Sequence, residues 1–447
     1  SVSLPDALES IGKDAFAECS SLSELYIPDS VRSIGSGALA GCSSLENLDI
    51  PFLGENESIA GTVPALFGWE DYRGCPGAFC SLKSVRVRGG EEIAAGAFYR
   101  CDLLEEVDYR QTIRSIGEDA FSGCASITSF TLPSGLETIG SGAFEGCYRL
   151  YEVENRSSLN VRAGSEGYGM VAKYALAVYG AGENMPERET DGDWTFMKTG
   201  GVRYLVGYGD RSFLSLPQTP QSYRIAPYLF YNDTNIERLD STGSAEIIGD
   251  YAFLQCAFLT KAVFSEGLKE IGEGAFSGCN ALTQVTLPAS LAEIGEGAFS
   301  SSCLYEAWNL SSLPVEAGGS DYGGVGKYAM FIYDSADEES RVAAEDGFIF
   351  VRDGEEWSLV AASQTDRVYL PEDGRIGGVR IDGYALGKGF GNEGIKVLYI
   401  PMEVERVGQG AFDGCTGLTA IYYEGTEEEW LQIGGYTPSG CSIVYES

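Results

Sequence analysis

The sequence predicts a solenoid, in which short coils stack on one another and each coil adds one strand to a parallel sheet. Two observations predict this fold class. Nearly the same segment occurs at residues 11–28, 116–133 and 271–288, and cysteines recur with a period of 23 residues, as from Cys101 to Cys124. One such unit cannot bury its own apolar face, so repeats of about 20 to 50 residues stack into an array.

Within each copy, the spacing of the apolar residues predicts one strand and one corner. Leu282, Val285 and Leu287 have a spacing that turns alternate residues of a short strand inward. Pro288 then ends the strand, because proline cannot donate a hydrogen bond to a sheet. Gly272 and the Gly-Ala-Phe step after it indicate a tight corner followed by a short helical turn. One copy is therefore one coil.

The number of Ala-Phe steps and their variants predicts the number of coils. They occur at about eleven places, namely Phe16, Leu39, Phe98, Phe121, Phe144, Phe230, Phe253, Phe276, Phe299, Leu386 and Phe412. We therefore expect about eleven coils in an elongated array, on the order of 50 Å long given the spacing of parallel strands.

Three segments interrupt the period and divide the chain. We expect solenoid coils at residues 1–51, 82–153, 225–304 and 381–423, a Gly- and aromatic-rich insertion at 52–81, β-hairpin insertions at 154–224 and 305–380, and a C-terminal cap at 424–447. Because the chain starts inside a coil, we also expect it to be a mature or trimmed ectodomain.

The two later insertions are copies of each other. The duplicated segments begin at Asn155 and Asn309, which are 154 positions apart, and each is followed by two strand-like runs. The glycine-containing segments 199–201 and 353–354 lie between these runs. Short turns of this composition connect the strands of β-hairpins, so each insertion is predicted to hold one hairpin.

The C-terminal segment predicts a helix that caps the array. Thr426 and Glu429 have the spacing of a capping box, and acidic residues fill the predicted first turn. Trp430, Leu431 and Ile433 would form an apolar face. The last coil needs such a cover because no further coil of the regular pattern follows it.

The repeated segment, with the pattern Ile-Gly-x-x-Ala-Phe-x-x-Cys-x-x-Leu-x-x-Val-x-Leu-Pro, resembles the BspA-type leucine-rich repeat, also called the Treponema-type repeat, of bacterial surface proteins. The resemblance covers most of the chain. It implies a right-handed leucine-rich-repeat solenoid with a parallel β-sheet on its concave side. It also implies a secreted or cell-surface location and a role in adhesion or in binding host or microbial ligands.

Nine of the twelve cysteines lie at or next to the repeat position. We interpret them as free thiols that fill a narrow corner, because neighbouring Cβ atoms that point in parallel fit disulfide geometry poorly. Two cysteines outside this ladder, Cys75 and Cys80, could close a small loop in an oxidising compartment or remain unpaired.

Composition excludes several functions. The formal charge of −36 repels nucleic acid and anionic lipid, and no run of apolar residues is long enough to span a membrane. The chain has no histidine, which removes the commonest general base and the usual metal ligand. We therefore expect no catalytic, metal-binding or cofactor-binding residues and no cofactor.

The outward positions of the repeated strands become the candidate binding surface. In the N-terminal third they carry mixed charge and an aromatic ring, at Tyr26, Asp49, Arg86, Asp108 and Thr131. Such a surface is typical of protein contacts, although a solvated strand face has the same composition. We expect a monomer that binds a host or microbial surface protein or glycan. The alternatives are a structural spacer that presents another domain and a hydrolase that uses two carboxylates.

Overall fold

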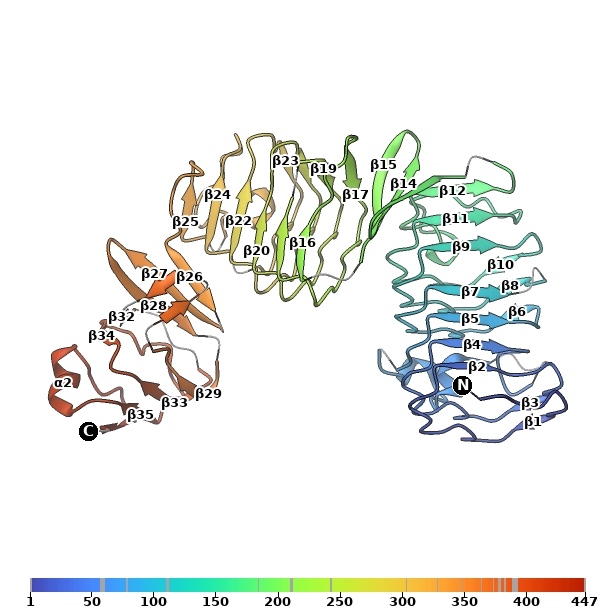
Figure 1. Ribbon diagram of the computed structural model, residues 1–447, viewed down its shortest axis with the longest axis horizontal. Coiled ribbons are helices and arrows are strands. Elements are labelled where there is room, and N and C mark those ends of the chain that lie inside the picture. Colours follow the sequence, from blue (N-terminus) through green and yellow to red (C-terminus); the bar gives the residue numbers. More distant parts are fainter. Residues whose placement is uncertain are drawn as a thin grey trace.

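The computed structural model describes residues 2–445, except for residues 57–60, 78, 110–111, 184, 210–211, 242, 303, 328, 346, 363, 373, 377–378, 382 and 388–392. The chain is a parallel-strand β-solenoid with few helices, which confirms the predicted fold class. Figure 1 shows three stacks of coils that follow one another along an arc, with the two termini at its opposite ends.

One strand of each coil joins a ladder of parallel strands, which we call the main ladder. Its strands in the first stack are β2 (Glu24–Tyr26), β4 (Asn47–Ile50), β5 (Ser84–Val87), β7 (Glu106–Tyr109), β9 (Ser129–Leu132), β11 (Glu152–Asn155) and β12 (Ala177–Gly180). In the second stack they are β16 (Phe213–Ser215), β18 (Arg238–Asp240), β20 (Lys261–Val263), β22 (Gln284–Leu287), β24 (Glu306–Asn309) and β25 (Phe331–Tyr333). The third stack has β29 (Asp366–Tyr369), β33 (Ile395–Ile400), β35 (Ala420–Tyr423) and β36 (Ser442–Tyr445).

A second ladder, which the sequence analysis does not predict, holds the coils together on another side. It consists of β1 (Ser10–Ile11), β3 (Ser33–Ile34), β6 (Glu92–Ile93), β8 (Ser115–Ile116), β10 (Thr138–Ile139), β17 (Tyr223–Ile225), β19 (Ala245–Ile248), β21 (Glu270–Ile271), β23 (Glu293–Ile294), β32 (Tyr384–Leu386) and β34 (Val404–Val407). Most of these strands comprise only the residues just before the recurring glycine of a coil, and all of them pair in parallel within this ladder.

Each hairpin insertion is continuous with the second ladder. The first module contains β13 (Glu187–Asp191), β14 (Trp194–Thr199) and β15 (Val202–Gly207), and the second contains β26 (Val342–Glu345), β27 (Phe348–Asp353) and β28 (Glu356–Ala362). The hairpin turns lie at residues 200–201 and 354–355, as predicted. The last strand of each module then pairs in parallel with the first second-ladder strand of the next stack. A further small hairpin joins β30 (Gly374–Ile376) to β31 (Val379–Ile381).

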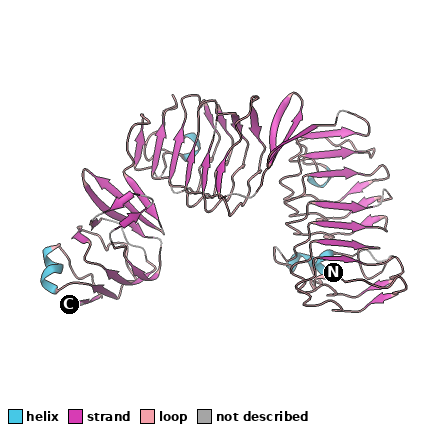
Figure 2. Ribbon diagram, viewed as in Figure 1, coloured by secondary structure: helices cyan, strands magenta, loops and turns pink. Residues whose placement is uncertain are grey.

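Helices are few among the described residues, as Figure 2 shows. They are α1 (Val63–Leu66), α2 (Glu427–Gln432) and three short 3₁₀ segments, η1 (Tyr72–Gly74), η2 (Tyr168–Met170) and η3 (Tyr322–Gly324). The corners of the regular coils form hydrogen-bonded turns rather than helices. In one of them the amide of Cys279 donates to the carbonyl of Phe276 at 3.2 Å.

Helix α2 forms where the sequence analysis expects the capping helix, although Leu431, expected on its apolar face, is 64% exposed. Thr426 is its N-cap residue, and the capping box with Glu429 is complete in both directions. The buried ring of Trp430 packs against Tyr423, with ring centroids 5.1 Å apart. Strand β36 then pairs with β35, so one more strand of the main ladder follows the helix.

The predicted count of about eleven coils is wrong, since the described residues supply 17 strands to the main ladder and form about 18 coils. The Ala-Phe step is absent or altered in the coils next to the insertions and at the C-terminus. Those coils nevertheless supply the strands β5, β12, β16, β25, β29 and β36. Val2 adds one more parallel bridge, to Leu25. Hydrogen bonding between adjacent strands therefore continues in the coils whose corner sequence differs from the repeat.

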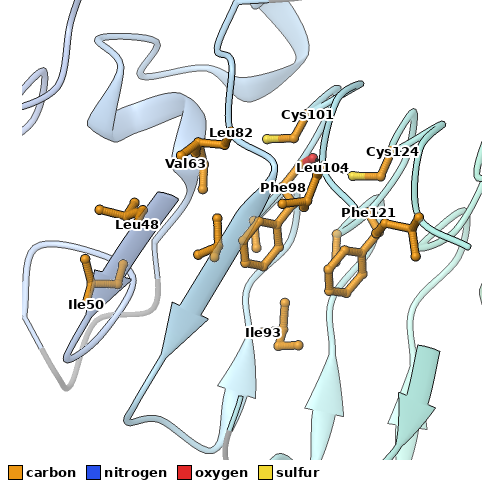
Figure 3. Packing of buried hydrophobic residues seen from close by; sticks show 14 of the residues in the cluster. Leu48, Ile50, Val63, Leu82, Ile93, Phe98, Cys101, Leu104, Phe121 and Cys124 are labelled. Atoms are coloured by element: carbon orange, nitrogen blue, oxygen red, sulfur yellow. Dashed lines mark hydrogen bonds between the residues drawn. The ribbon is translucent and has the colours of Figure 1, made fainter. Parts of the chain in front are cut away.

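Stacked phenylalanines form the spine of each core. In the second stack the rings of Phe230, Phe253, Phe276 and Phe299 lie nearly parallel, with successive centroids 4.5, 4.9 and 5.2 Å apart. The backbone is tied at the same corner, because the amide of each of the first three donates to the alanine carbonyl one coil ahead. Figure 3 shows the equivalent pair, Phe98 and Phe121, in the first stack, with Cys101 and Cys124 beside them.

Most of the described ladder cysteines are buried thiols, and several of them form hydrogen bonds with a neighbouring coil. Cys124, Cys147, Cys256 and Cys279 are fully buried or nearly so, and each thiol donates to a phenylalanine carbonyl of the preceding coil at 3.0 to 3.1 Å. Cys303 lies outside the described residues. Cys75 and Cys80 are also buried free thiols, and the sulfur of Cys80 lies 3.8 Å from that of Cys101.

We expect thiol-specific reagents to modify Cys19 in the native protein and to leave the buried ladder cysteines untouched until the protein is denatured. Cys19 is exposed, whereas burial raises the pKa of Cys124 and Cys147 and so suppresses the reactive thiolate. Peptide mass spectrometry before and after denaturation, without reductant, measures the order of modification. Rapid native modification of Cys279, or disulfides among four or more ladder cysteines, would contradict this prediction.

Candidate ligand-binding strand face

The main ladder has an inward and an outward face because side chains alternate along each strand. Leu25, Leu48 and Val85 point inward and are buried. The residues on either side of them in the strand point outward. We call the outward side of the main ladder the strand face, and the sequence places its candidate binding residues there.

Four of the five predicted site residues form one row. The parallel register pairs Tyr26 with Asp49, Asp49 with Arg86, and Arg86 with Asp108. Thr131 does not join this row directly: it belongs to β9 in the next sheet, where it pairs with Glu154.

A hollow of about 430 Å³ lies over the start of this row. Tyr26, Asp49 and Arg86 contribute to its lining, together with Val2, Glu24, Leu25, Asn47, Leu48 and Ser84. The Tyr26 side chain is 51% exposed, so its ring is available to a ligand. The predicted residues thus meet around one concave surface.

Ion pairs already neutralise most charges of the row. Arg86 lies 3.0 Å from Asp108, and Arg88 contacts both Asp49 and Asp29. The guanidinium of Arg88 also lies over the ring of Tyr26, 4.7 Å from its centroid. These contacts hold the side chains of the row in place, and Asp49 serves as a salt-bridge partner there.

The sequence analysis does not identify Arg88, although a signal for it exists. Most regular coils end their strand with proline, as at Pro28, Pro51 and Pro288, and Arg88 occupies the same position after β5. Replacing a strand-ending proline by arginine places a long cation at the edge of the strand face.

Three tyrosines form a second feature, on the third stack, which we call the tyrosine stripe. Tyr369 pairs with Tyr399, and Tyr399 pairs with Tyr422, on adjacent strands. Their rings are stacked, with centroids 4.1 and 4.8 Å apart. Tyr369 is 60% exposed. The inward neighbours Val368 and Leu398 fill the core, so the stripe is not needed for core packing.

A hollow of about 290 Å³ runs along the tyrosine stripe. All three tyrosines line it, together with Leu370, Glu372, Ile400, Pro401 and Glu424. A hydrogen bond with Tyr369 raises the pKa of the Tyr399 hydroxyl above its ordinary value. Tyr369 is not among the predicted site residues, because its coil lacks an Ala-Phe step. The shared Tyr-(Ile/Leu)-Pro ending at Tyr26, Tyr369 and Tyr399 could have revealed it.

No group of three or more acidic or cysteine side chains in the described part of the chain is arranged to hold a metal ion. Within the same residues, no helix is long and apolar enough to cross a membrane. The arrangement on the strand face offers aromatic stacking, hydrogen bonding and ion pairing.

Comparison with known families now decides the assignment. A family model described as the BspA type leucine rich repeat region matches in six copies, over residues 1–59, 78–164, 213–314 and 387–445. The chain belongs to the BspA-type leucine-rich repeat family. The matched ranges lie on the three stacks and largely leave out the hairpin strands β13 to β15 and β26 to β28.

The BspA-type chain is also similar to solved bacterial structures. A leucine-rich cell surface protein from Faecalibacterium prausnitzii is 18% identical, with 97% of this chain and 81% of that chain covered and a TM-score of 0.28. A leucine-rich repeat protein from Bacteroides ovatus is 18% identical, with coverage of 98% and 87% and a TM-score of 0.22. The pneumococcal vaccine antigen PcpA is 16% identical, with coverage of 98% and 85% and a TM-score of 0.24. A search of curated proteins finds no match.

Proposed function

We propose that this chain is a non-enzymatic binding protein, secreted or held on a bacterial cell surface, that binds a macromolecular ligand on its strand face. The ligand class is a surface protein or glycan of a host or of another microbe. Membership of the BspA-type family supports the location and the absence of catalysis, because repeat solenoids of this kind act chiefly as extended binding surfaces.

The tyrosine stripe is the observation that supports binding most directly. A solvated strand face needs no aromatic rings, yet Tyr369, Tyr399 and Tyr422 lie side by side over a hollow. Tyrosine supplies a large, rigid contact area and loses little conformational entropy on binding, which is why it is enriched at interfaces. The hollow around Tyr26 provides a second place of the same kind on the first stack.

The strand face favours binding over the two alternatives. A spacer gains nothing from exposed aromatic rows, and water-exposed aromatic area promotes aggregation unless a partner covers it. For a hydrolase, the pair of acids must be available to substrate. In the first hollow Asp49 is already paired with Arg88.

We expect the triple variant Tyr369→Ser/Tyr399→Ser/Tyr422→Ser to bind its ligand at least about tenfold more weakly than the parent protein, because interface aromatics often contribute more than about 1 kcal/mol each. The ligand is first sought on arrays of host matrix proteins and glycans. Affinities are then measured by surface plasmon resonance. The melting temperature should change little, since the stripe faces outward.

The matched control removes exposed apolar side chains that lie away from the strand face. Leu103→Ser/Phe258→Ser does so at two corners, because these residues are 45% and 56% exposed. This control should bind as the parent does. A parent protein that binds no array member would favour the spacer function. A triple variant with parental affinity would exclude the stripe from the interface.

A further inference from the structure

The central stack has a row of outward side chains in which two cations lie side by side. The register of the main ladder pairs Phe213 with Arg238, and Arg238 with Lys261. Lys261 in turn pairs with Gln284. Figure 1 shows β16, β20 and β22, three of the four strands that supply this row, in the central stack. Because adjacent strands are about 4.8 Å apart, the four side chains form a continuous row across the strands.

The juxtaposition of Arg238 and Lys261 is unfavourable for the empty protein. Like charges on directly neighbouring strand positions destabilise a sheet. Lys261 is also partly buried, and its desolvation, together with the charge of Arg238, lowers the pKa of its ammonium group. Within the described residues Lys261 has no ion-pair partner, and its ammonium nitrogen lies 5.8 Å from the ring centroid of Trp308.

Several other basic residues of the chain form ion pairs with acids. Arg86 pairs with Asp108 at 3.0 Å, and Lys269 pairs with Glu246 at 3.0 Å. In a chain with 66 acidic and 30 basic residues, such pairing is the expected arrangement. Lys261 departs from it, because its ammonium group forms no ion pair among the described residues.

The acids nearest to the row do not neutralise it. Arg238 contacts Asp240 at 3.4 Å, in an exposed and loose ion pair. Glu306, on the next strand beyond Gln284, is fully buried and accepts hydrogen bonds from Tyr333, Ser340 and two backbone amides. Its carboxylate is therefore engaged inside the protein. Asp240 and Glu306 raise the pKa of Lys261 by less than desolvation and Arg238 lower it, so an anionic ligand in contact with Lys261 would supply charge that the row lacks there.

An exposed aromatic ring begins the row. Phe213 is 49% exposed, and the guanidinium of Arg238 lies 5.6 Å from its ring centroid. Phenylalanine has no polar tip that would explain its exposure. Across the strands the row thus offers an aromatic face, two cations and the side-chain amide of Gln284, which already donates from its nitrogen to Glu306.

The spacing of the row distinguishes between two kinds of anionic chain. The contact points repeat at the strand spacing of about 4.8 Å, whereas side chains on one side of an extended peptide repeat at about 6.6 Å. One pyranose unit of a linear glycan is close in length to the strand spacing. A sugar ring can stack its C–H face on an aromatic ring, while guanidinium and ammonium groups bind carboxylate or sulfate.

We propose that the row Phe213, Arg238, Lys261 and Gln284 binds an acidic glycan, a linear chain of pyranose units with carboxylate or sulfate groups that runs across the strands of the central stack. This inference rests on the proposed function, because it names a ligand class for the same strand face. Phe213 stacks on one sugar ring, Arg238 and Lys261 bind the acidic groups, and Gln284 accepts a hydrogen bond from a hydroxyl group.

The negative charge of the whole molecule limits this interaction but does not prevent it. At physiological ionic strength the Debye length is about 8 Å, so distant acids are screened while the cation pair acts at contact. We therefore expect binding at about 0.15 M salt, with an affinity that falls at higher salt as the local contacts are screened in turn.

Calorimetric titration with defined oligosaccharides tests the proposal. The probes are a sulfated heparin oligosaccharide, an oligogalacturonate that carries only carboxylates, and neutral maltohexaose. We expect at least one acidic probe to bind and the neutral probe not to bind. Lys261→Met and Arg238→Met should each weaken binding at least tenfold, and Arg238→Lys should weaken it less. Lys269→Met, which removes an exposed and paired lysine, is the matched control and should leave binding unchanged.

The melting temperature of the variants distinguishes a binding role of the cation pair from a structural role. If the cation pair serves only a ligand, the melting temperature of Lys261→Met should equal or exceed that of the parent, because a like-charge contact is removed. The proposal is overturned if neither acidic probe binds at millimolar concentration, if maltohexaose binds equally well, or if both methionine variants bind as the parent does. Loss of acidic-glycan binding from a protein whose tyrosine stripe still binds an array ligand would remove this inference and leave the proposed function intact.

Discussion

Replacing Phe276 by alanine should lower the free energy of unfolding by about 3–5 kcal/mol, which is the range for truncating a buried phenylalanine. The ring of Phe276 is fully buried and stacks between Phe253 and Phe299. The cavity that the removed ring would leave cannot close easily, because the corner backbones on both sides of Phe276 are tied by hydrogen bonds. The amide of Phe276 donates to Ala298 at 2.6 Å, and the amide of Phe253 donates to Ala275 at 2.8 Å.

Chemical unfolding measures the size of this effect, and hydrogen exchange measures its extent. In a solenoid each coil contacts mainly its neighbours, so amide protection should fall first in the coils of Phe253 and Phe299. Phe258→Ala, at an exposed corner position, serves as the control and should change stability little. A uniform loss of protection from Phe16 to Phe412 would instead show that the three stacks unfold as one unit.

Replacing Glu306 by alanine should cost on the order of 3 kcal/mol, because several buried donors would lose their acceptor. Its carboxylate accepts hydrogen bonds from the Tyr333 hydroxyl at 2.6 Å and from Ser340 at 2.6 Å. It also accepts from the amides of Arg341 and Val342, at 2.6 and 3.1 Å. These contacts attach the second hairpin module to the last regular strand of the central stack.

Thermal unfolding compares three variants. Glu306→Gln keeps the shape and part of the accepting capacity, so it should destabilise less than Glu306→Ala. Glu293→Ala removes an exposed acid of the same stack and should have little effect. If Glu306→Ala melts at the parental temperature, the module must be held by its apolar contacts and by its strand pairing alone.

The same attachment occurs in the first module. Glu152, 154 residues earlier, accepts a hydrogen bond from Tyr179 at 2.6 Å and binds Arg188. The duplicated sequence therefore repeats a contact as well as a pattern of strands. Arg188 replaces the backbone donors that serve Glu306, so the two copies meet the same need with different partners.

The sequence predicts the fold wherever the structure depends on local spacing. The capping box of Thr426 and Glu429 and the hairpin turns are local signals, and all are present. The second ladder could not be predicted, since strands such as Glu270–Ile271 are too short to show a periodic pattern. The coil count failed because it relied on the corner residues, whereas the ladder depends on backbone hydrogen bonds that leave little trace in the sequence.

Part of the candidate site could be predicted for the same reason. The repeated strand pattern places Tyr26, Asp49, Arg86 and Asp108 at equivalent positions, and the parallel register aligns them in one row although the insertion at 52–81 separates Asp49 from Arg86. Tyr369 lies inside the predicted insertion at 305–380, in a coil without an Ala-Phe step, so its pairing with Tyr399 could not be predicted. Each strand also has two outward positions, one before and one after its inward residue. The predicted site residues all occupy the second of these positions. Lys261 occupies the first.

The connections of the hairpin modules to the two ladders allow the chain to evolve by gain or loss of whole units. The first module follows β12, which extends the main ladder, and ends with β15, which begins the second ladder of the next stack. A copied segment of stack plus module would therefore find matching hydrogen-bond partners at both of its ends. Recombination between the two copies, offset by 154 residues, could lengthen or shorten the protein in whole units without exposing a new apolar end.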